Sequence, residues 1–474
     1  MNSEGLVATT RAPGTAGLFT RIGARVSWVA MAYLWVIYML NSNMRQWFSI
    51  VQPSLVEEFH LTPATMGLYS GLLTAAVGVS GIAFSPLLVG GGRGWARKYR
   101  HLPIALCYGF FSVLTGIGML TTSFAVIFVF QLIKNLASGV GEVAEVTTIA
   151  EWWPLERRGF AQGLHHTAFP WGSLIGGLAI SAVLGIFGST HWRYIFLILP
   201  FALLPVLFLF WRFSTSENYT RFVTDTRARN LAPPLADDEQ TYRAPPGAFW
   251  RTVRNPNVLV TAIASGFGNF SLYGLGFWLP AYLAFIVHYP IAKVAAYSVL
   301  FTITGGIGQI VWGSISDFYG RKFSLVLMFL WLTVAFLLFR FAGAGLAALI
   351  AIQLFAGMAT NGIYPVLYSM GSDSCERGTI TIANGLNIGG VILGGCGTIV
   401  VGALIQWGGG YSSPAGFALS LYVLAGAMAL SAVMLALFTR ETNGRFMHLD
   451  RALVSRESCL RNKYVHNSNR GDVP

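Results

Sequence analysis

Three charged residues lie inside one long apolar stretch of this sequence. They are Lys134, Glu142 and Glu145, and the stretch, residues 124–148, has the length and character of a membrane-spanning helix. A charged side chain near the bilayer centre costs about 2.5–3.5 kcal/mol on insertion scales, so it must face the protein interior or a water-filled cavity. At 100° per residue, Lys134, Ser138 and Glu145 share one helical face, and Glu142 lies at its edge. The pattern predicts a pathway for a solute or a proton.

Glu142 and Glu145 stand three residues apart toward one end of this predicted span. Two close carboxylates repel each other, and burial disfavours their charged forms, which suits groups that bind and release a proton. We therefore expect proton coupling at Glu142, whereas Glu145 lies nearer the end of the span and has a more structural part. The alternative is an ion pair with Lys134 or with an arginine of a neighbouring loop. Lys134 is either a second contact for an anion or the partner of a carboxylate.

Arg45 is the candidate anchor for an anionic substrate. It shares a helical face with Tyr38 and Asn41 in the predicted span 27–50, which makes that face polar. A planar guanidinium group can donate two parallel hydrogen bonds to a carboxylate. An arginine toward the end of a span can instead extend to the lipid headgroups. Both interpretations are open on the sequence.

The second half of the chain supplies a different kind of polar group. No Lys, Arg, Asp or Glu lies well inside its predicted spans. If the two halves enclose a central site, the first supplies charge and the second supplies neutral hydrogen bonds and aromatic surface. Each polar residue of the second half could instead make a hydrogen bond to a neighbouring helix, worth about 0.6 kcal/mol. The candidate substrate contacts in this half are Asn269, Tyr273, Asn361 and Tyr364.

The composition indicates a membrane protein. The chain has 474 residues, of which 54% are hydrophobic and 11% charged, and its mean hydropathy is +0.59. A soluble domain carries about 25% charged residues. The net charge of +12 is not gathered into a stripe, so we expect no nucleic-acid partner. No metal-ligand spacing, nucleophile elbow or phosphate-binding loop is present, and we expect no enzyme activity, metal or cofactor.

Twelve apolar windows of about 20 residues recur along the chain. We predict an all-α membrane protein of 12 transmembrane helices in two six-helix bundles, joined by a polar, proline-containing linker. The predicted division is an N-terminal segment 1–26, a bundle 27–211, a linker 212–257, a bundle 258–438 and a tail 439–474.

The basic residues predict the orientation of the spans. Nearly all of the 31 Lys and Arg residues fall in the termini, the linker and the loops on the same side. Only Arg193, Lys293 and Arg340 fall in loops on the other side. Positive charge marks the cytoplasmic side of a membrane, so we place both termini and the linker in the cytoplasm. We expect a monomer in the lipid bilayer of a bacterial inner membrane, and no cleaved secretory signal.

This layout resembles the Major Facilitator Superfamily. Residues 313–322 read Gly-Ser-Ile-Ser-Asp-Phe-Tyr-Gly-Arg-Lys and are similar to the signature loop of that family, Gly-x-x-x-Asp-x-x-Gly-Arg-Lys/Arg. The equivalent loop of the first half, residues 90–100, keeps glycines and basic residues but has no aspartate. The resemblance implies a gating loop made of Asp317, Gly320, Arg321 and Lys322.

Two further segments resemble the anion:cation symporter branch of that family. Residues 139–142 read Gly-Val-Gly-Glu, residues 151–157 read Glu-Trp-Trp-Pro-Leu-Glu-Arg, and Arg45 precedes Pro-Ser-Leu at 53–55. The branch often has an arginine where this chain has Asn135. The resemblance implies proton-coupled uptake of a small organic anion by alternating access. An exporter or exchanger of the same fold, and a transporter-like sensor, are the alternatives.

Overall fold

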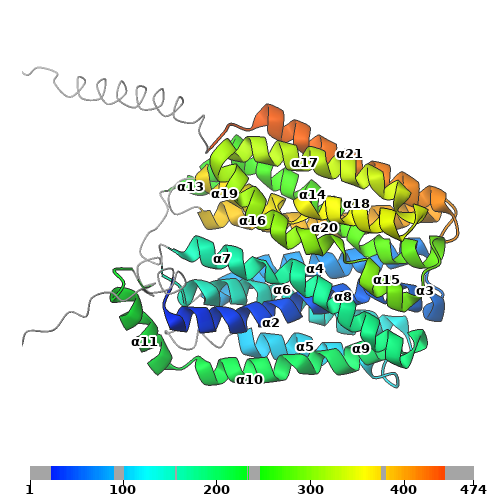
Figure 1. The fold of residues 1–474 in the computed structure, drawn as a ribbon, viewed down its shortest axis with the longest axis horizontal. Helices are drawn as coiled ribbons and strands as arrows, with labels where there is room; N and C mark the ends of the chain where they lie inside the picture. The colour runs from blue at the N-terminus through cyan, green and yellow to red at the C-terminus, as the bar shows by residue number, and fades with distance from the viewer. Residues whose placement is uncertain are drawn as a thin grey trace, which may run out of the picture.

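The computed structural model describes residues 23–442 except 90–100, 155–156, 232, 234–245 and 375–379. Long helices run side by side in two groups, one from each half of the chain (Figure 1). The helices of the first group are α2 (Arg25–Ile50), α4 (Pro63–Val89), α5 (His101–Gly116), α6 (Phe124–Glu151), α7 (Arg158–His166), α8 (Ala168–Phe187), α9 (Arg193–Ile198) and α10 (Leu203–Phe213). Those of the second are α14 (Pro256–Ala281), α15 (Ile291–Tyr297), α16 (Phe301–Tyr319), α17 (Arg321–Leu338), α18 (Leu346–Thr360), α19 (Ile363–Asp373), α20 (Ile380–Trp407) and α21 (Pro414–Phe438).

Ten segments of the described chain are long and apolar enough to cross a membrane. The apolar part of α5, Leu102–Gly116, is shorter. Helix α2 has the length but is less apolar, because it carries Asn41, Asn43 and Arg45. Together these elements account for twelve membrane helices, with pairs such as α7 and α8 forming one span. The predicted all-helical architecture of two six-helix bundles is confirmed.

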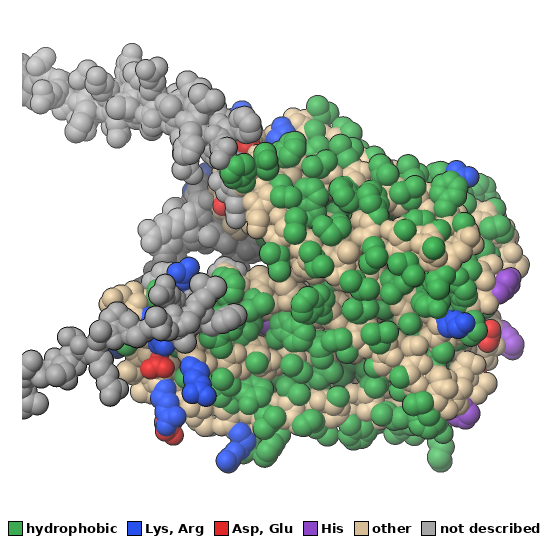
Figure 2. All heavy atoms as spheres, in the orientation of Figure 1, with side chains coloured by type: hydrophobic (Ala, Val, Ile, Leu, Met, Phe, Trp, Pro, Cys, Tyr) green, Lys and Arg blue, Asp and Glu red, His purple; other side chains and the backbone are tan. Residues whose placement is uncertain are grey.

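The flanks of both bundles are covered by hydrophobic side chains, whereas most charged side chains lie toward the two ends of the helices (Figure 2). Ile186, Phe208 and Leu437 expose 75%, 59% and 70% of their surface. An apolar surface of this extent is unfavourable in water and favourable against lipid tails. The protein is a multi-pass integral membrane protein.

Glycine residues bring the two bundles into contact along α4 and α20. A Cβ atom on Gly395 would overlap the backbone carbonyl of Gly71, and one on Gly71 would overlap Ile399. On the other flank, Gly177 of α8 lies against Ala295 of α15. Small residues allow such close approach of membrane helices.

Substitution of Gly395 by alanine is expected to separate α4 from α20. The added methyl group meets backbone atoms, which cannot rotate away, so we expect a loss of about 1–3 kcal/mol of stability, the usual cost of overpacking. Gly426 of α21 has open space around it and is the matched control. The midpoint of thermal unfolding should fall for Gly395→Ala and stay constant or rise for Gly426→Ala. Equal midpoints for the two variants would contradict this account of the interface.

A hydrogen-bonded cluster ties together the turns at the end of the first bundle opposite the linker. Glu58, in the short helix α3 (Gln52–Phe59), accepts hydrogen bonds from Arg193 at 2.6 and 2.9 Å and from the Trp192 indole at 2.8 Å. Arg193 also donates to the carbonyl of Thr121 at 3.0 Å. Burial by itself raises the pKa of the Glu58 carboxyl, but these hydrogen bonds outweigh it and hold that pKa below its ordinary value.

The Glu58 cluster makes a pH-dependent contribution to stability. Because its folded-state pKa is lowered, the stabilisation is present above the ordinary glutamate pKa of about 4.3 and is lost as pH falls through the folded-state value. We expect Glu58→Gln to cost less than about 1 kcal/mol at pH 7, since the pair is partly exposed. Unfolding midpoints measured from pH 7 to pH 3 should converge for the two proteins. A constant difference over that range would exclude the ion pair as its source.

At the linker end, the signature loop binds the last described residues of the chain. Gly320 adopts φ = 112°, a left-handed conformation that glycine tolerates, between α16 and α17. Glu441 accepts a hydrogen bond from the backbone N–H of Arg321 at 2.6 Å, and Lys322 Nζ donates to the Thr439 carbonyl at 2.8 Å. The Arg321 guanidinium lies 3.5 Å from the carboxylate of Asp373.

Among the described residues, the acids that meet this loop are therefore Asp373 and Glu441, which the sequence analysis did not associate with it. The side chain of Asp317, predicted as part of the gating loop, lies outside the described residues, as does the first-half loop 90–100. Two short helices, α11 (Ser216–Arg227) and α13 (Ala248–Val253), lie within the predicted linker.

Candidate functional site

An ion pair joins α2 to α6 in the interior of the first bundle. Arg45 Nη1 lies 2.7 Å from Glu142 Oε2. Arg45 Nε donates to the Ser138 hydroxyl at 2.7 Å, and Nη2 donates to the Ser138 carbonyl at 3.0 Å. The guanidinium group is thus held on three sides by α6 and does not extend to the lipid headgroups.

The polar face of α2 meets the polar face of α6. Tyr38 donates a hydrogen bond to Glu142 Oε1 at 3.1 Å, so both oxygens of that carboxylate have a donor. Asn41 accepts a hydrogen bond from the Ser138 hydroxyl, and its amide lies 3.4 Å from the Ser138 carbonyl. The spacing of Tyr38, Asn41 and Arg45, three and four residues apart, is what brings all three to α6.

This ion pair faces the space between the two bundles. The side chain of Arg45 is 10% exposed and that of Glu142 is 32% exposed, although both lie within long helices. Tyr273 of α14 lies within electrostatic reach of both groups, and Tyr368 of α19 within reach of Glu142. Tertiary packing thus places neutral tyrosines of the second half across from the charged groups of the first half.

The other second-half candidates make contacts of their own. The Tyr364 hydroxyl donates to Asn269 Oδ1 at 3.0 Å, and the Asn269 amide donates to the Ser265 carbonyl at 2.9 Å. This pair links α19 to α14, both of which also carry the tyrosines near the ion pair. Asn361, at the end of α18, has its amide nitrogen against Gly305 of α16, and its contact with a substrate stays a prediction.

Lys134 is not paired with a carboxylate among the described residues, and its contact with an anion stays a prediction. It is 1% exposed, and its ammonium group donates to the backbone carbonyl of Met44 at 2.8 Å. Glu142 pairs with Arg45 instead of Lys134. The lysine therefore links α6 to α2 at the residue next to Arg45, within electrostatic reach of that arginine.

Glu145 is buried inside the first bundle. It is 0% exposed, and its carboxylate lies near Asn41 and the Tyr108 ring. Within the described part of the chain it forms no ion pair. A buried charge without a partner is costly, so a neutral, protonated acid is the form that suits this place.

Three residues close to the ion pair were not among the predicted site residues. His165 stacks on Tyr38 with 4.7 Å between ring centroids, and His166 lies within electrostatic reach of Glu142. Tyr368 follows Tyr364 by one helical turn, on the same face. The histidine pair at the start of the fifth span and the i, i+4 tyrosines were the signals available in the sequence.

The two bundles meet directly beyond the ion pair, at the end away from the linker. Phe48, one turn after Arg45, stacks on Phe277 of α14 with 6.3 Å between ring centroids. Both side chains are buried. Trp278 lies beside Gly67 of α4 in the same region. This aromatic pair closes the space between the bundles on that side.

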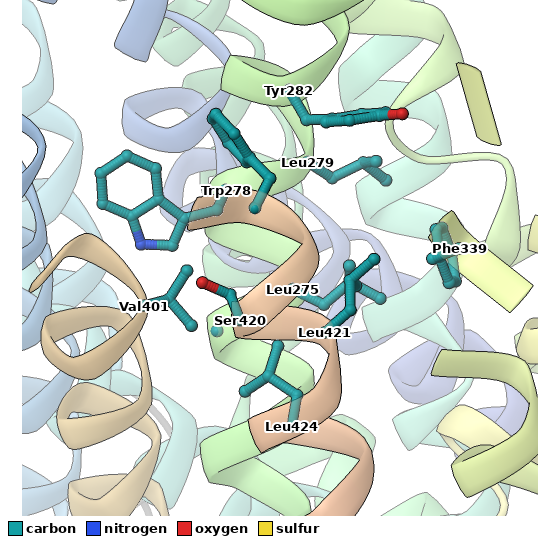
Figure 3. Close-up of a pocket in the computed structure, with 11 residues that line it drawn as sticks. Leu275, Trp278, Leu279, Tyr282, Phe339, Val401, Ser420, Leu421 and Leu424 are labelled. Carbon is teal, nitrogen blue, oxygen red and sulfur yellow. The ribbon is translucent and has the colours of Figure 1, made fainter. Parts of the chain in front are cut away.

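A small apolar pocket lies elsewhere in the second bundle (Figure 3). Its volume is about 30 Å³, room for no more than a few water molecules. It holds no charged side chain and lies away from the ion pair, so it is not a site for an anion. Its lining consists of Gly274, Leu275, Trp278, Leu279, Tyr282, Phe339, Val401, Phe417, Ser420, Leu421 and Leu424.

Comparisons with known proteins define the class. The Major Facilitator Superfamily model matches residues 34–301 and 288–446, and the chain belongs to this family. It is similar to a solved structure of the xylose transporter XylE from E. coli in an inward open conformation, with a TM-score of 0.64, 15% identity, and coverage of 88% of this chain and 98% of XylE. The protein is therefore a membrane transporter by fold and family, and not an enzyme.

Two relatives of low sequence identity have names that state a substrate. The chain is 24% identical over 439 residues to the cis,cis-muconate transport protein of Acinetobacter baylyi, covering 89% of this chain and 96% of that protein. It is 24% identical over 366 residues to a glucose-6-phosphate exchanger of Danio rerio, covering 70% of this chain and 71% of that protein.

Proposed function

We propose that this protein imports a small organic anion, a carboxylate, together with protons by alternating access. The observation that carries the proposal is the Arg45–Glu142 ion pair, which is partly exposed through Glu142 and lies within electrostatic reach of Tyr273 of the second half. Substrate sites of transporters with internal repeats lie near the bilayer midplane at the interface of the repeats. The named muconate relative supports an organic anion as substrate.

In this proposal, the substrate carboxylate takes the place that Glu142 holds on Arg45. Glu142 Oε2 sits at 2.7 Å from Nη1, the distance of a charge-assisted hydrogen bond. A proton on Glu142 removes its charge and weakens its hold on Arg45. An incoming carboxylate then restores the charge balance of the guanidinium group.

Proton and anion binding support each other in this scheme. If a proton on Glu142 raises the affinity for the anion, the bound anion raises the affinity for the proton by the same factor. Glu145, buried and without an ion-pair partner among the described residues, is proposed as a second proton-carrying group. Tyr38 and Asn41 position the pair, and Asn269, Tyr273 and Tyr364 present the second-half surface to the substrate.

Exchange of one anion for another is the second candidate. The glucose-6-phosphate exchanger among the relatives favours it. It needs the same anion site but no coupled proton.

Transport by purified protein in liposomes separates these candidates. Labelled aromatic acids, sugar acids and short carboxylates are offered with and without a pH gradient, and with and without unlabelled anion inside. We expect accumulation that requires the gradient and needs no internal anion. Uptake that requires internal anion and ignores the gradient would establish exchange. Binding without any movement would establish a sensor.

We also propose the placement given by the basic residues. The termini and the linker lie on the cytoplasmic side of a bacterial inner membrane, so the Phe48–Phe277 contact between the bundles lies toward the outer side. The chain works as a monomer with the division 1–26, 27–211, 212–257, 258–438 and 439–474.

A further inference from the structure

The two charges of the Arg45–Glu142 ion pair cancel. Arg45 carries one positive charge, and Glu142, bonded to it, carries one negative charge. The nearest further cation on these two helices, Lys134, is 1% exposed and directs its ammonium group to the Met44 carbonyl. Glu145 is fully buried on the same helix. Neither side chain is open to a ligand between the bundles, so neither can pair with a second charge on that ligand.

The described part of the second bundle adds no charge next to the ion pair. Its described charged side chains lie at helix ends, as with Lys293 in α15 and Asp373 at the end of α19. What it presents to Arg45 and Glu142 are phenol groups. The hydroxyls of Tyr273 and Tyr368 form no hydrogen bond with other described residues, and both side chains are half-buried. They are available as neutral hydrogen-bond donors and acceptors.

Resting on the function proposed above, we propose that this site selects organic monoanions over dianions of the same skeleton. The single carboxylate pairs with Arg45, and an uncharged body carrying a hydroxyl or carbonyl group lies against Tyr273 and Tyr368. A second negative charge on the ligand would meet neutral tyrosines or Glu142 and would have no cation to pair with. An unpaired charge away from bulk water is expensive, whereas a hydroxyl group is satisfied by a phenol.

Three pairs of ligands test this selectivity. In each, the second member repeats the skeleton of the first with one more acidic group, which gives a dianion in the first two pairs and a more highly charged anion in the third: sorbate and trans,trans-muconate, gluconate and glucarate, and gluconate and 6-phosphogluconate. Binding of each to the purified full-length protein is measured by calorimetry at one pH and one salt concentration. We expect the monoanion of each bound pair to bind at least about tenfold more tightly, a difference of about 1.4 kcal/mol.

A charge-neutralising variant shows whether the ion pair sets this preference. At a pH high enough for Glu142 to stay ionised when the anion binds, Glu142→Gln leaves Arg45 as an uncompensated cation, so the site gains one positive charge relative to the wild-type protein. The ratio of monoanion to dianion affinity should then fall at least about tenfold. Glu58→Gln removes a carboxylate from another arginine ion pair, that of Arg193, and is the matched control. It should leave the ratio unchanged.

His166 lies within electrostatic reach of Glu142, so a charge on it would enter the same balance. The variant His166→Gln, measured in the same way, should keep the preference for monoanions. Loss of the preference in that variant would assign it to the histidine and overturn the proposal.

The outcomes separate this inference from the proposed function. Dianions that bind as tightly as their monoanionic partners, while Arg45→Ala abolishes binding of both, would overturn the selectivity and leave the anion site in place. Binding that does not depend on Arg45, or no binding by any ligand of the three pairs and of the wider panel, would overturn the proposed function and this inference with it.

Discussion

Arg45→Ala is expected to abolish anion binding and transport. Arg45 is the one guanidinium group that the described structure places between the bundles beside the second-half tyrosines. Truncating one partner of a buried, hydrogen-bonded charge pair costs about 2–5 kcal/mol. Affinity should therefore fall at least about thirtyfold, as measured by calorimetry with an anion that the wild-type protein binds. Arg45→Lys keeps the charge but loses the planar fork, so it should recover only part of the affinity.

The same substitution leaves Glu142 without its partner, which could destabilise the fold. The double variant Arg45→Ala, Glu142→Gln removes both charges and tests binding in a protein without that unpaired carboxylate. Arg340→Ala, near the end of the second bundle, where Arg340 contacts Tyr422, is the matched control for loss of one arginine. Wild-type affinity in the folded double variant would show that the anion binds elsewhere.

Glu142→Gln is expected to uncouple transport from the pH gradient. The amide keeps the size of the side chain but cannot take up or release a proton. Accumulation driven by a pH gradient should fall at least about tenfold, whereas exchange of labelled for unlabelled anion should persist because Arg45 remains. Both activities can be measured in the same liposome preparation.

The control for this variant is Glu58→Gln, which neutralises a carboxylate in the cluster at the opposite end from the linker. It should accumulate anion as the wild-type protein does. Gradient-driven accumulation by Glu142→Gln at the wild-type level would remove Glu142 from the coupling mechanism. Loss of both accumulation and exchange would instead assign Glu142 to the binding of the anion itself.

Much of the architecture was accessible from the residues because the bilayer constrains it so strongly. Only helices satisfy their backbone hydrogen bonds within lipid, so apolar windows of about 20 residues predicted the spans. Helix α2 shows why a hydropathy threshold by itself is insufficient. Its polar face with Asn41 and Arg45 lowers the mean hydropathy, and the same face carries the candidate site. The high charge cost in lipid is what drew attention to Arg45 and Glu142.

The tertiary structure, by contrast, decided which side chains pair with each other. Helical periodicity placed Lys134 and Glu145 on one face of α6, but it did not indicate what lies opposite that face. The packing of α2 against α6 brings Arg45 to Glu142 and leaves Lys134 on a backbone carbonyl. In the same way, the signature loop contacts Glu441, which is 120 residues away in the chain.

The sequence by itself determined that this chain is a bundle of membrane helices with buried charge in its first half and neutral polar groups in its second. The composition and the helical periodicity of polar residues are enough for this conclusion. Each helix must keep its polar face away from lipid, whichever helices lie beside it. Only the tertiary structure decided which charges neutralise each other and which tyrosines face them. Those pairings join residues roughly a hundred or more positions apart, and their geometry depends on how whole helices pack, a property that no local pattern contains.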